Sequence, residues 1–249
     1  MKCVACGFIP LLLFLCSCNN YANLQIALKN PDKVTKLNLS RCHIVKLPPE
    51  IGKLTNLKTL NLFKNDLETL PAEIGNLKNL EKLVLSSNNL KTLPPEIGNC
   101  QKLKTLSIQD NKLESLPKEI GLLYMLEVFN ADGNYLNTLP PEIGSMVSLS
   151  YLFLNRNRLT SLPNSIGKLS SLKVLDLNIN QLKTLPDEVG NLNKLMQINI
   201  SKAGALVRVP ESLCGLPVLE YFYIDNNTAV PYCFQAYRGP RLKVINLGN

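Results

Sequence analysis

The chain of 249 residues contains no tryptophan and a single histidine, and aromatic residues make up only 6% of it. So few aromatic rings indicate a core built from aliphatic side chains. The histidine, His43, follows Cys42, and one histidine beside one cysteine makes neither a tetrahedral zinc site nor an oriented catalytic triad. We therefore expect Cys42 to be buried, His43 to lie at the surface, and the chain to hold no metal.

Other catalytic signatures are missing as well. The sequence shows no glycine-rich phosphate loop and no pair of carboxylates on a defined scaffold, so we predict that the protein is not an enzyme and uses no cofactor. The net charge is +8, but the 27 basic residues are interleaved with 19 acidic ones and form no dense run. This pattern is typical of a solvated basic surface and argues against nucleic acid as a partner.

Hydrophobic residues are abundant, at 45% of the chain, and they recur with a fixed period. The pattern LxxLxLxxNxLxxLP begins at ten positions, which lie 23 residues apart except for one interval of 24. A constant period of this length predicts a solenoid, in which each unit adds one short parallel strand and the stacking of neighbours makes the core. The origins of the units are Val34, Leu57, Leu80, Leu103, Leu126, Leu149, Leu172, Leu195, Leu219 and Leu242.

The side chains of each strand should alternate between core and surface. In the unit that begins at Leu57, Leu60 and Leu62 are expected to point inward while Thr59 and Asn61 face out. Eight residues after the origin stands an asparagine, whose amide can bond buried backbone groups where the chain leaves the strand. These ladder asparagines are Asn65, Asn88, Asn111, Asn134, Asn157 and Asn180.

The return segment of each unit carries LP followed by IG or VG, as in Leu47-Pro48 and Ile51-Gly52. Proline restrains this segment, and we expect the glycine to close it with an unusual backbone angle. The convex side should then consist of short 3₁₀ or single-turn helices. The predicted fold is a curved α/β solenoid of about ten short parallel strands.

The two ends depart from the repeat. Residues 1–18, MKCVACGFIPLLLFLCSC, are predicted to be an export signal, because a lysine precedes an apolar run too short for a transmembrane span. Residues 19–33 are predicted to be an N-terminal cap, residues 34–228 the repeats, and residues 229–249 a C-terminal cap with a final half-repeat that starts at Leu242. The ladder asparagine is lost near Ala203 and is expected to return at Asn227.

Besides Cys42, three cysteines lie within or after the repeats. Cys100 occupies a slot that leucine fills elsewhere, so we expect a small buried hydrophobic residue there. Cys214 and Cys233 are disulfide candidates, since in oxidising surroundings a bridge would close a loop of about 20 residues and stabilise the fold. The sequence leaves open whether their α-carbons come close enough.

Residues 34–228 resemble the LPxxIGxLxxLxxLxLxxNxLxx class of leucine-rich repeats, and the whole chain resembles the leucine-rich-repeat proteins that leptospiral spirochaetes carry in many copies. The resemblance implies a binding module whose concave strand face contacts the partner, whereas the identity of the ligand does not carry over. The N-terminus resembles a bacterial lipoprotein signal, with Leu15 three residues before Cys18 and Ser17 directly before it. That resemblance implies lipidation at Cys18.

The concave face is the predicted partner-binding surface. Outward side chains at the same offset in successive repeats form columns, and their apolar and aromatic members gather around Tyr151 and Phe153. A contiguous exposed patch of this kind is a typical interaction anchor, although tyrosine, phenylalanine and valine also favour strands without any ligand. The surrounding candidates are Val128, Asn130, Arg156, Val174 and Asp176, with Tyr221 and Tyr223 as a second patch.

We therefore predict an exported protein, lipid-anchored in a bacterial cell envelope, that recognises a protein partner, host-derived or not, through its concave face. Two alternatives stay open. One is a secreted effector that occupies a host signalling protein, which an acylated terminus would disfavour. The other is an envelope structural protein without a foreign ligand, which self-association alone would favour. The oligomeric state does not follow from the sequence.

Overall fold

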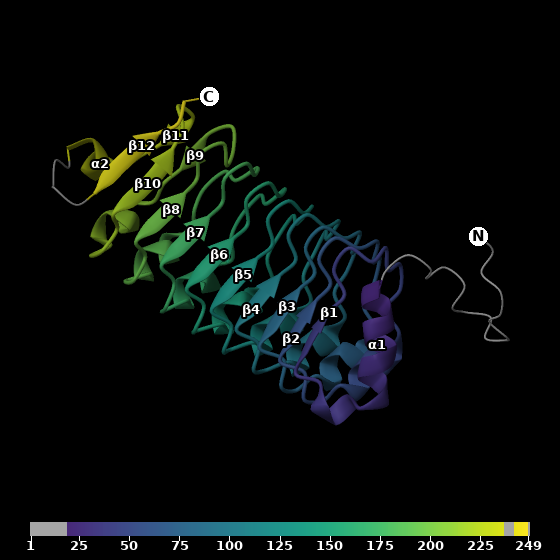
Figure 1. Cartoon of the computed structure of the whole chain (residues 1–249). Coiled ribbons are helices and arrows are strands. Elements are labelled where there is room, and N and C mark those ends of the chain that lie inside the picture. The colour runs from purple at the N-terminus through teal and green to yellow at the C-terminus, as the bar shows by residue number, and fades with distance from the viewer. Residues whose placement is uncertain (1–18, 237–241, 249) are drawn as a thin grey trace.

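The computed structural model of the chain describes residues 19–236 and 242–248, so the predicted export signal and Cys18 lie outside the described residues. Within that range, ten strands form one parallel sheet whose order follows the chain (Figure 1). They are β1 (Lys36–Asn38), β2 (Thr59–Asn61), β3 (Lys82–Val84), β4 (Thr105–Ser107), β5 (Val128–Asn130), β6 (Tyr151–Phe153), β7 (Val174–Asp176), β8 (Gln197–Asn199), β10 (Tyr221–Ile224) and β12 (Lys243–Asn246). The prediction of a repeat solenoid with parallel strands is confirmed.

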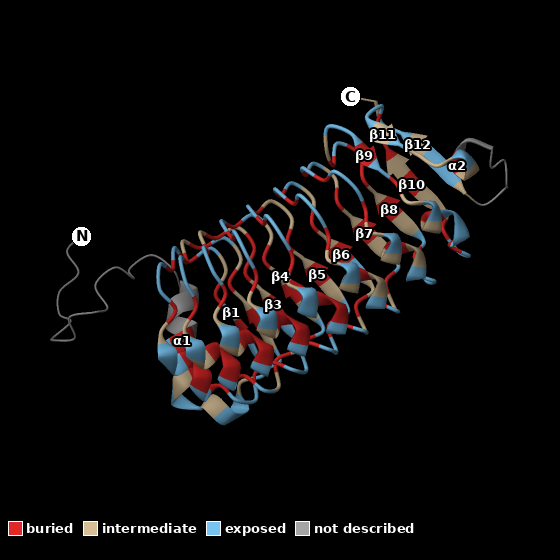
Figure 2. Cartoon of the chain, turned by 180° about the vertical axis from the view of Figure 1, so that it is seen from behind, coloured by how far each residue is buried: buried red, intermediate tan, exposed pale blue. Residues whose placement is uncertain are grey.

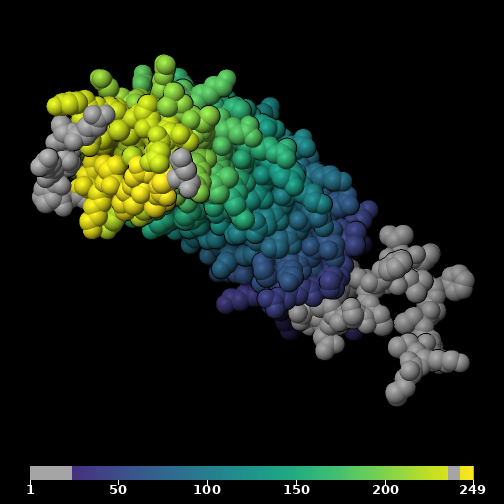
Figure 3. All heavy atoms as spheres, turned by 90° about the horizontal axis from the view of Figure 1, so that it is seen from above, coloured from purple at the N-terminus to yellow at the C-terminus, as the bar shows by residue number. Residues whose placement is uncertain are grey.

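The register of the sheet follows the repeat. Lys36, Leu37 and Asn38 of β1 lie opposite Thr59, Leu60 and Asn61 of β2, and the same offsets pair in every step to β8. In the three-residue strands β1 to β8 the middle residue is buried, and its two neighbours face the open side of the sheet. Figure 2 shows these buried positions running along the whole stack, and Figure 3 shows the repeats following one another along its long axis.

The opposite side of the solenoid consists of 3₁₀ helices of five residues, as expected for a return segment restrained by proline. Their glycines behave differently from the prediction. Gly52 and Gly121 do not have a positive φ angle, so the expected unusual backbone angle is wrong. A β-carbon on Gly121 would lie 2.4 Å from the carbonyl oxygen of Glu142 in the next repeat. Glycine is required there because neighbouring helices stack too closely for a side chain. The helices are η2 (Pro49–Lys53), η3 (Ala72–Asn76), η4 (Pro95–Asn99), η5 (Lys118–Leu122), η6 (Pro141–Ser145), η7 (Asn164–Lys168), η8 (Asp187–Asn191) and η9 (Glu211–Gly215).

The ladder asparagines are buried and join successive repeats, as the sequence predicted. Asn134 is representative. Its Oδ1 accepts a hydrogen bond from the backbone N–H of Leu113 (3.1 Å), and its Nδ2 donates to the carbonyl oxygens of Ile108 (3.0 Å) and Ala131 (3.1 Å). Each amide therefore satisfies backbone groups of its own repeat and of the repeat before it.

The N-terminal end of the stack is covered by α1 (Asn19–Lys29), which packs against β1 and is followed by η1 (Pro31–Lys33) (Figure 1). Leu24 and Ala27 are buried and Leu28 is partly buried, a spacing that places all three on one face of the helix. Ile26 points away from that face and is 61% exposed.

The ladder does not return at Asn227, which is exposed. Instead Asp225 is buried, and its carboxylate accepts hydrogen bonds from the backbone N–H groups of Lys202 and Asn227 and from the hydroxyl of Thr228. The prediction at Asn227 is wrong because β10 is one residue longer than the strands before it, so the first polar residue after the strand takes the buried position.

Two further short strands lie beside this turn. The extra residue of the irregular repeat allows β9 (Val207–Arg208) to pair with β11 (Thr228–Ala229) in a separate parallel sheet. Val207 of β9 is buried and joins the aliphatic core. The irregular segment thus keeps its core while it changes its backbone pairing.

The final strand is displaced by one residue from the expected period. Phe222 of β10 lies opposite Val244 of β12, and Tyr223 lies opposite Ile245. The sequence had placed the last origin at Leu242, which would put Ile245 in the core column. The period fails because α2 (Tyr232–Ala236) replaces the proline segment between these strands.

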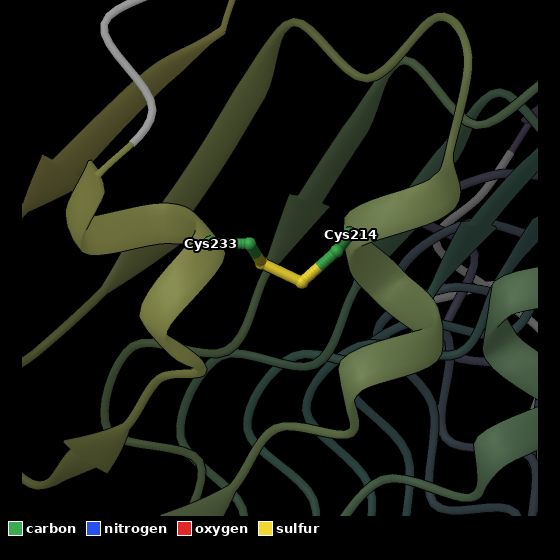
Figure 4. The surroundings of a disulfide bond; sticks show 2 residues. All are labelled: Cys214 and Cys233. Carbon is green, nitrogen blue, oxygen red and sulfur yellow. A yellow bond between two sulfur atoms is a disulfide. The ribbon is translucent and has the colours of Figure 1, made fainter.

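A disulfide joins Cys214 of η9 to Cys233 of α2, as Figure 4 shows, with a Cα–Cα distance of 6.1 Å. This separation falls in the usual range for a bridge. The bond ties α2 to the last 3₁₀ helix, and Phe234 of the same helix packs its ring against Phe222 at 5.0 Å between centroids. The C-terminal end is thus closed by a covalent link together with an aromatic contact.

Candidate functional site

The structure brings together the residues that the sequence placed at the centre of the concave face. Val128, Tyr151 and Val174 lie opposite one another across β5, β6 and β7, and so do Asn130, Phe153 and Asp176. Tyr151 is 38% exposed, and the other five side chains are half-buried. We call these six residues the central patch.

Asp132 and Asn155 lie just beyond the strand ends and were not among the predicted site residues. The backbone N–H of Asn155 donates a hydrogen bond to Oδ1 of Asp132 at 2.7 Å. Burial raises the pKa of Asp132 from its ordinary 3.8 to about 6, and the carboxylates of Asp176 and Asp110 act in the same direction. The Asn155 N–H and Arg156 favour the ionised form and only partly offset that burial.

Asp176 has a related environment at the end of β7. Its Oδ1 accepts a hydrogen bond from the backbone N–H of Asn178 at 3.0 Å, and burial raises the pKa of its carboxyl. Among the described residues, neither Asp132 nor Asp176 takes part in an ion pair. The Oδ1 atom of Asn155, which follows the strand between them, is buried and has no hydrogen-bond partner there.

Arg156, a predicted site residue, is bound to an acid two repeats away. Its Nη2 lies 2.8 Å from Oδ1 of Asp110, and the side chain crosses Gly133 of the intervening repeat. A β-carbon on Gly133, whose φ is +62°, would lie 2.4 Å from that Asp110 oxygen. The absence of a side chain at Gly133 therefore makes room for the ion pair, which forms one rim of the central patch.

The second predicted patch is separate from the first. Tyr221 and Tyr223 lie on β10 with nearly parallel rings whose centroids are 6.3 Å apart, and Nζ of Lys243 lies 5.4 Å from the centroid of the Tyr221 ring. Between the two patches runs β8, which contributes the polar Gln197 and Asn199. Because a cation already lies over Tyr221, this patch differs in charge from the centre.

The other predictions about chemistry concern cysteine and metals. Cys100 is buried, and burial raises the pKa of its thiol to about 11, which keeps it in the unreactive neutral form. In the described part of the chain, no group of three or more histidine, cysteine or acidic side chains is placed to hold a metal ion. No helix of residues 19–236 or 242–248 combines the length and apolarity needed to cross a membrane.

The stacked strand, asparagine turn and 3₁₀ return define a leucine-rich-repeat solenoid. A family model described as a leucine-rich repeat region matches residues 12–108, 95–178 and 141–231, so the chain belongs to the leucine-rich-repeat family. This family generally serves as a non-enzymatic scaffold for protein interactions. No curated protein matches the chain.

Solved structures agree with this assignment. A leucine-rich-repeat protein of Leptospira interrogans is 31% identical with a TM-score of 0.73, and the match covers 91% of this chain and 70% of that one. A plant peptide hormone receptor, RGFR1 in complex with RGF2, is 32% identical with a TM-score of 0.72, over 86% of this chain and 36% of the receptor. The ectodomain of the Arabidopsis thaliana receptor kinase GASSHO1/SCHENGEN3, in complex with CASPARIAN STRIP INTEGRITY FACTOR 2, is 28% identical with a TM-score of 0.65, over 89% and 31%. The chain thus spans only about a third of each plant receptor.

Proposed function

We propose that the chain is an exported, lipid-anchored leucine-rich-repeat protein that binds a protein partner through its concave face. The observation that carries this proposal is the central patch, where Tyr151 and Phe153 face the open side of the sheet among apolar neighbours. The core of each repeat is complete without them, because Leu152 already fills the inward position of β6. Aromatic side chains gathered on a free face are typical anchors for a partner.

The similar proteins support a macromolecular ligand. The structure of RGFR1 shows a peptide hormone receptor with RGF2, and that of GASSHO1/SCHENGEN3 shows an ectodomain with CASPARIAN STRIP INTEGRITY FACTOR 2. Both resemble this chain over most of its length in backbone arrangement. We infer that a protein or peptide, host-derived or not, is the partner here.

The test of the concave face is a double variant, Tyr151→Ala with Phe153→Ala. A control removes two exposed apolar side chains that follow η5 and η6, Tyr124→Ala with Val147→Ala. For a protein captured by the unsubstituted chain, the central double variant should weaken binding by about a hundredfold, since two exposed anchors would be lost. The control should bind unchanged. Equal affinity of all three proteins, with unchanged melting temperatures, would place the site elsewhere.

The membrane part of the proposal rests on the sequence. Within its family we assign the chain to the 23-residue LPxxIG class of leptospiral-type lipoproteins, with Cys18 as the acylated residue of a cell-envelope protein. Metabolic labelling with a fatty acid should mark the protein, Cys18→Ala should abolish the label, and Cys16→Ala should retain it. Proteolysis of intact cells then reports surface exposure. A released and unlabelled protein would instead favour the secreted effector, and self-association alone would favour an envelope structural role.

A further inference from the structure

Two half-buried carboxylates lie near Phe153: Asp176 belongs to the central patch, and Asp132 lies two residues beyond the end of β5. Asp176 is the direct neighbour of Phe153 in β7, and Asp132 follows β5 on the other side. Neighbouring strands are about 4.8 Å apart and a strand rises about 3.3 Å per residue, so the backbones of the two acids are separated by about 10 Å across the sheet and about 7 Å along it. Arg156 is the cation that acts on Asp132, and its guanidinium is already bound to Asp110. Neither acid therefore forms an ion pair among the described residues.

Each carboxylate accepts a backbone hydrogen bond, Asp132 from Asn155 and Asp176 from Asn178, but neither is paired with a cation among the described residues. Removing a carboxylate from water without pairing it is unfavourable, and the raised pKa values of Asp132 and Asp176 express this. Asn155, at the end of the strand between them, adds a buried Oδ1 with no donor. Acceptors of three adjacent repeats thus lie at the end of β7 and just beyond the ends of β5 and β6. A donor that carries positive charge would compensate the charge of the two half-buried carboxylates.

We propose that the central patch takes an extended segment of the partner that carries a lysine or arginine beside an apolar side chain. The cation lies against the ring of Phe153 between Asp132 and Asp176, where ion pairing and a cation–π contact act together. The apolar neighbour packs on Val128, Tyr151 and Val174. This inference names the partner chemistry of the concave face and so rests on the function proposed above.

The overall charge of +8 disfavours a basic partner at long range. The local arrangement of charges at the central patch outweighs this repulsion. At physiological salt, charges separated by more than about 8 Å are largely screened from one another. The lysines of the outward columns nearest the centre are Lys82 in β3 and Lys243 in β12, each at least three strands from Phe153. At contact distance the ligand therefore meets Asp132 and Asp176 first.

The experiment selects ligands from a display library of random dodecapeptides on the full, folded chain. Enriched peptides should carry lysine or arginine next to an apolar or aromatic residue. Their affinity should fall about tenfold or more in a double variant, Asp132→Asn with Asp176→Asn, which keeps the size of both side chains. The matched control makes the same change of charge at exposed positions on the helical side, Glu50→Gln with Glu142→Gln, and should bind as the unsubstituted chain does.

The outcomes separate this inference from the proposed function. Enriched peptides that lose affinity in the Tyr151→Ala, Phe153→Ala variant but are acidic or neutral, or that bind the Asp132→Asn, Asp176→Asn variant normally, would overturn the basic ligand and leave the concave site intact. Peptides indifferent to Tyr151 and Phe153, or no enrichment at all, would overturn both.

A second measurement needs no variant. The groups whose charges act on Asp132 are Asp110, Asp176 and Arg156. Its protonation as the pH falls from about 7.5 to about 5 should weaken binding of an enriched basic peptide severalfold, because one counter-ion is lost. A peptide without basic residues should show no such change. Affinity of the basic peptide that is constant over this interval would contradict the proposal.

Discussion

The middle repeats, β2 to β7, and the C-terminal end, β9 to β12, satisfy the same backbone demands in different ways. In the middle, one buried asparagine per repeat bonds the turn of its own repeat and of the one before. At the C-terminal end Ala203 stands where that asparagine would be, and the turn is held by buried Asp225 and by the β9–β11 pair. The disulfide in addition ties η9 to α2 at this end.

This difference shows that the repeat requires an acceptor for the buried backbone N–H groups of each turn but does not determine which side chain supplies it. Every turn that leaves a strand has buried backbone donors, and a side-chain oxygen must accept from them whether it belongs to an amide or to a carboxylate. In the regular repeats a single asparagine is enough, because it bonds backbone groups of two repeats. Where the register shifts, Asp225 and the β9–β11 pair replace the asparagine, and the disulfide adds a covalent link. The features of this end can be tested against those of the middle repeats.

The largest effect is expected from Asn134→Ala in the middle. The change removes the acceptor of the Leu113 N–H and the donor to the Ile108 and Ala131 carbonyls, all buried, so the free energy of unfolding should fall by about 4 kcal/mol. Asn227→Ala, at an exposed side chain of the irregular end, should change it by less than about 0.5 kcal/mol. Urea unfolding followed by circular dichroism measures both. Equal losses would remove the distinction between the two regions.

Loss of the disulfide should act on the C-terminal end. Cys214→Ser with Cys233→Ser opens a link across 19 residues of sequence, which should lower the free energy of unfolding by about 3 kcal/mol. Amide hydrogen exchange should quicken in β10 and β12 and stay unchanged in β4 to β6, since those strands do not depend on the bridge. Reduction of the unsubstituted protein should give the same pattern. Uniform acceleration along the stack would contradict a local role.

A smaller effect distinguishes two glycines of the helical side. Gly121→Ala places a β-carbon 2.4 Å from the Glu142 carbonyl oxygen, so the free energy of unfolding should fall by about 2 kcal/mol. Gly215→Ala, in the last 3₁₀ helix, meets no described atom within 4 Å and should change it by less than about 0.5 kcal/mol. Denaturant midpoints decide between them. Similar losses at both positions would point to backbone freedom instead of close stacking.

The smallest effect concerns pH. The pKa of Asp132 is raised from 3.8 to about 6, so the folded protein binds this proton more tightly than the unfolded chain does. Ionisation therefore destabilises the fold above about pH 6, and the penalty vanishes below about pH 4. Asp132→Asn should stabilise the protein at neutral pH by on the order of 1 kcal/mol, after allowance for solvent screening, and the gain should disappear in acid. Exposed Glu50→Gln serves as the control. A gain independent of pH would show that charge is not its cause.

The period and the alternation of side chains were enough to predict much of this structure. Leu60 and Asn65 could be placed because their roles depend on neighbours at fixed offsets, which every repeat supplies again. The same reasoning failed for Gly121, whose role depends on how closely two helices stack, and for Asn227 and Val244, where the register is set by the longer strand β10 and by α2.

The candidate site was predictable to the same extent. Tyr151 and Phe153 follow from the outward offsets of a strand. Asp132 and Asn155 do not follow from these offsets, because they lie beyond the strand. Nothing in the sequence indicates that burial raises the pKa of Asp132 or leaves Oδ1 of Asn155 without a hydrogen-bond partner. A search for polar residues two positions after each strand would have found both.

The glycines on the helical side also set the shape of the opposite face. Each repeat is a wedge, and its thickness on the helical side is limited by how near a glycine such as Gly121 lets the next carbonyl approach. Thicker residues in this column would spread the outer rim, increase the angle between successive wedges and tighten the arc of the solenoid. The radius of the concave face, and with it the size of object that fits there, is governed by residues that never touch that object.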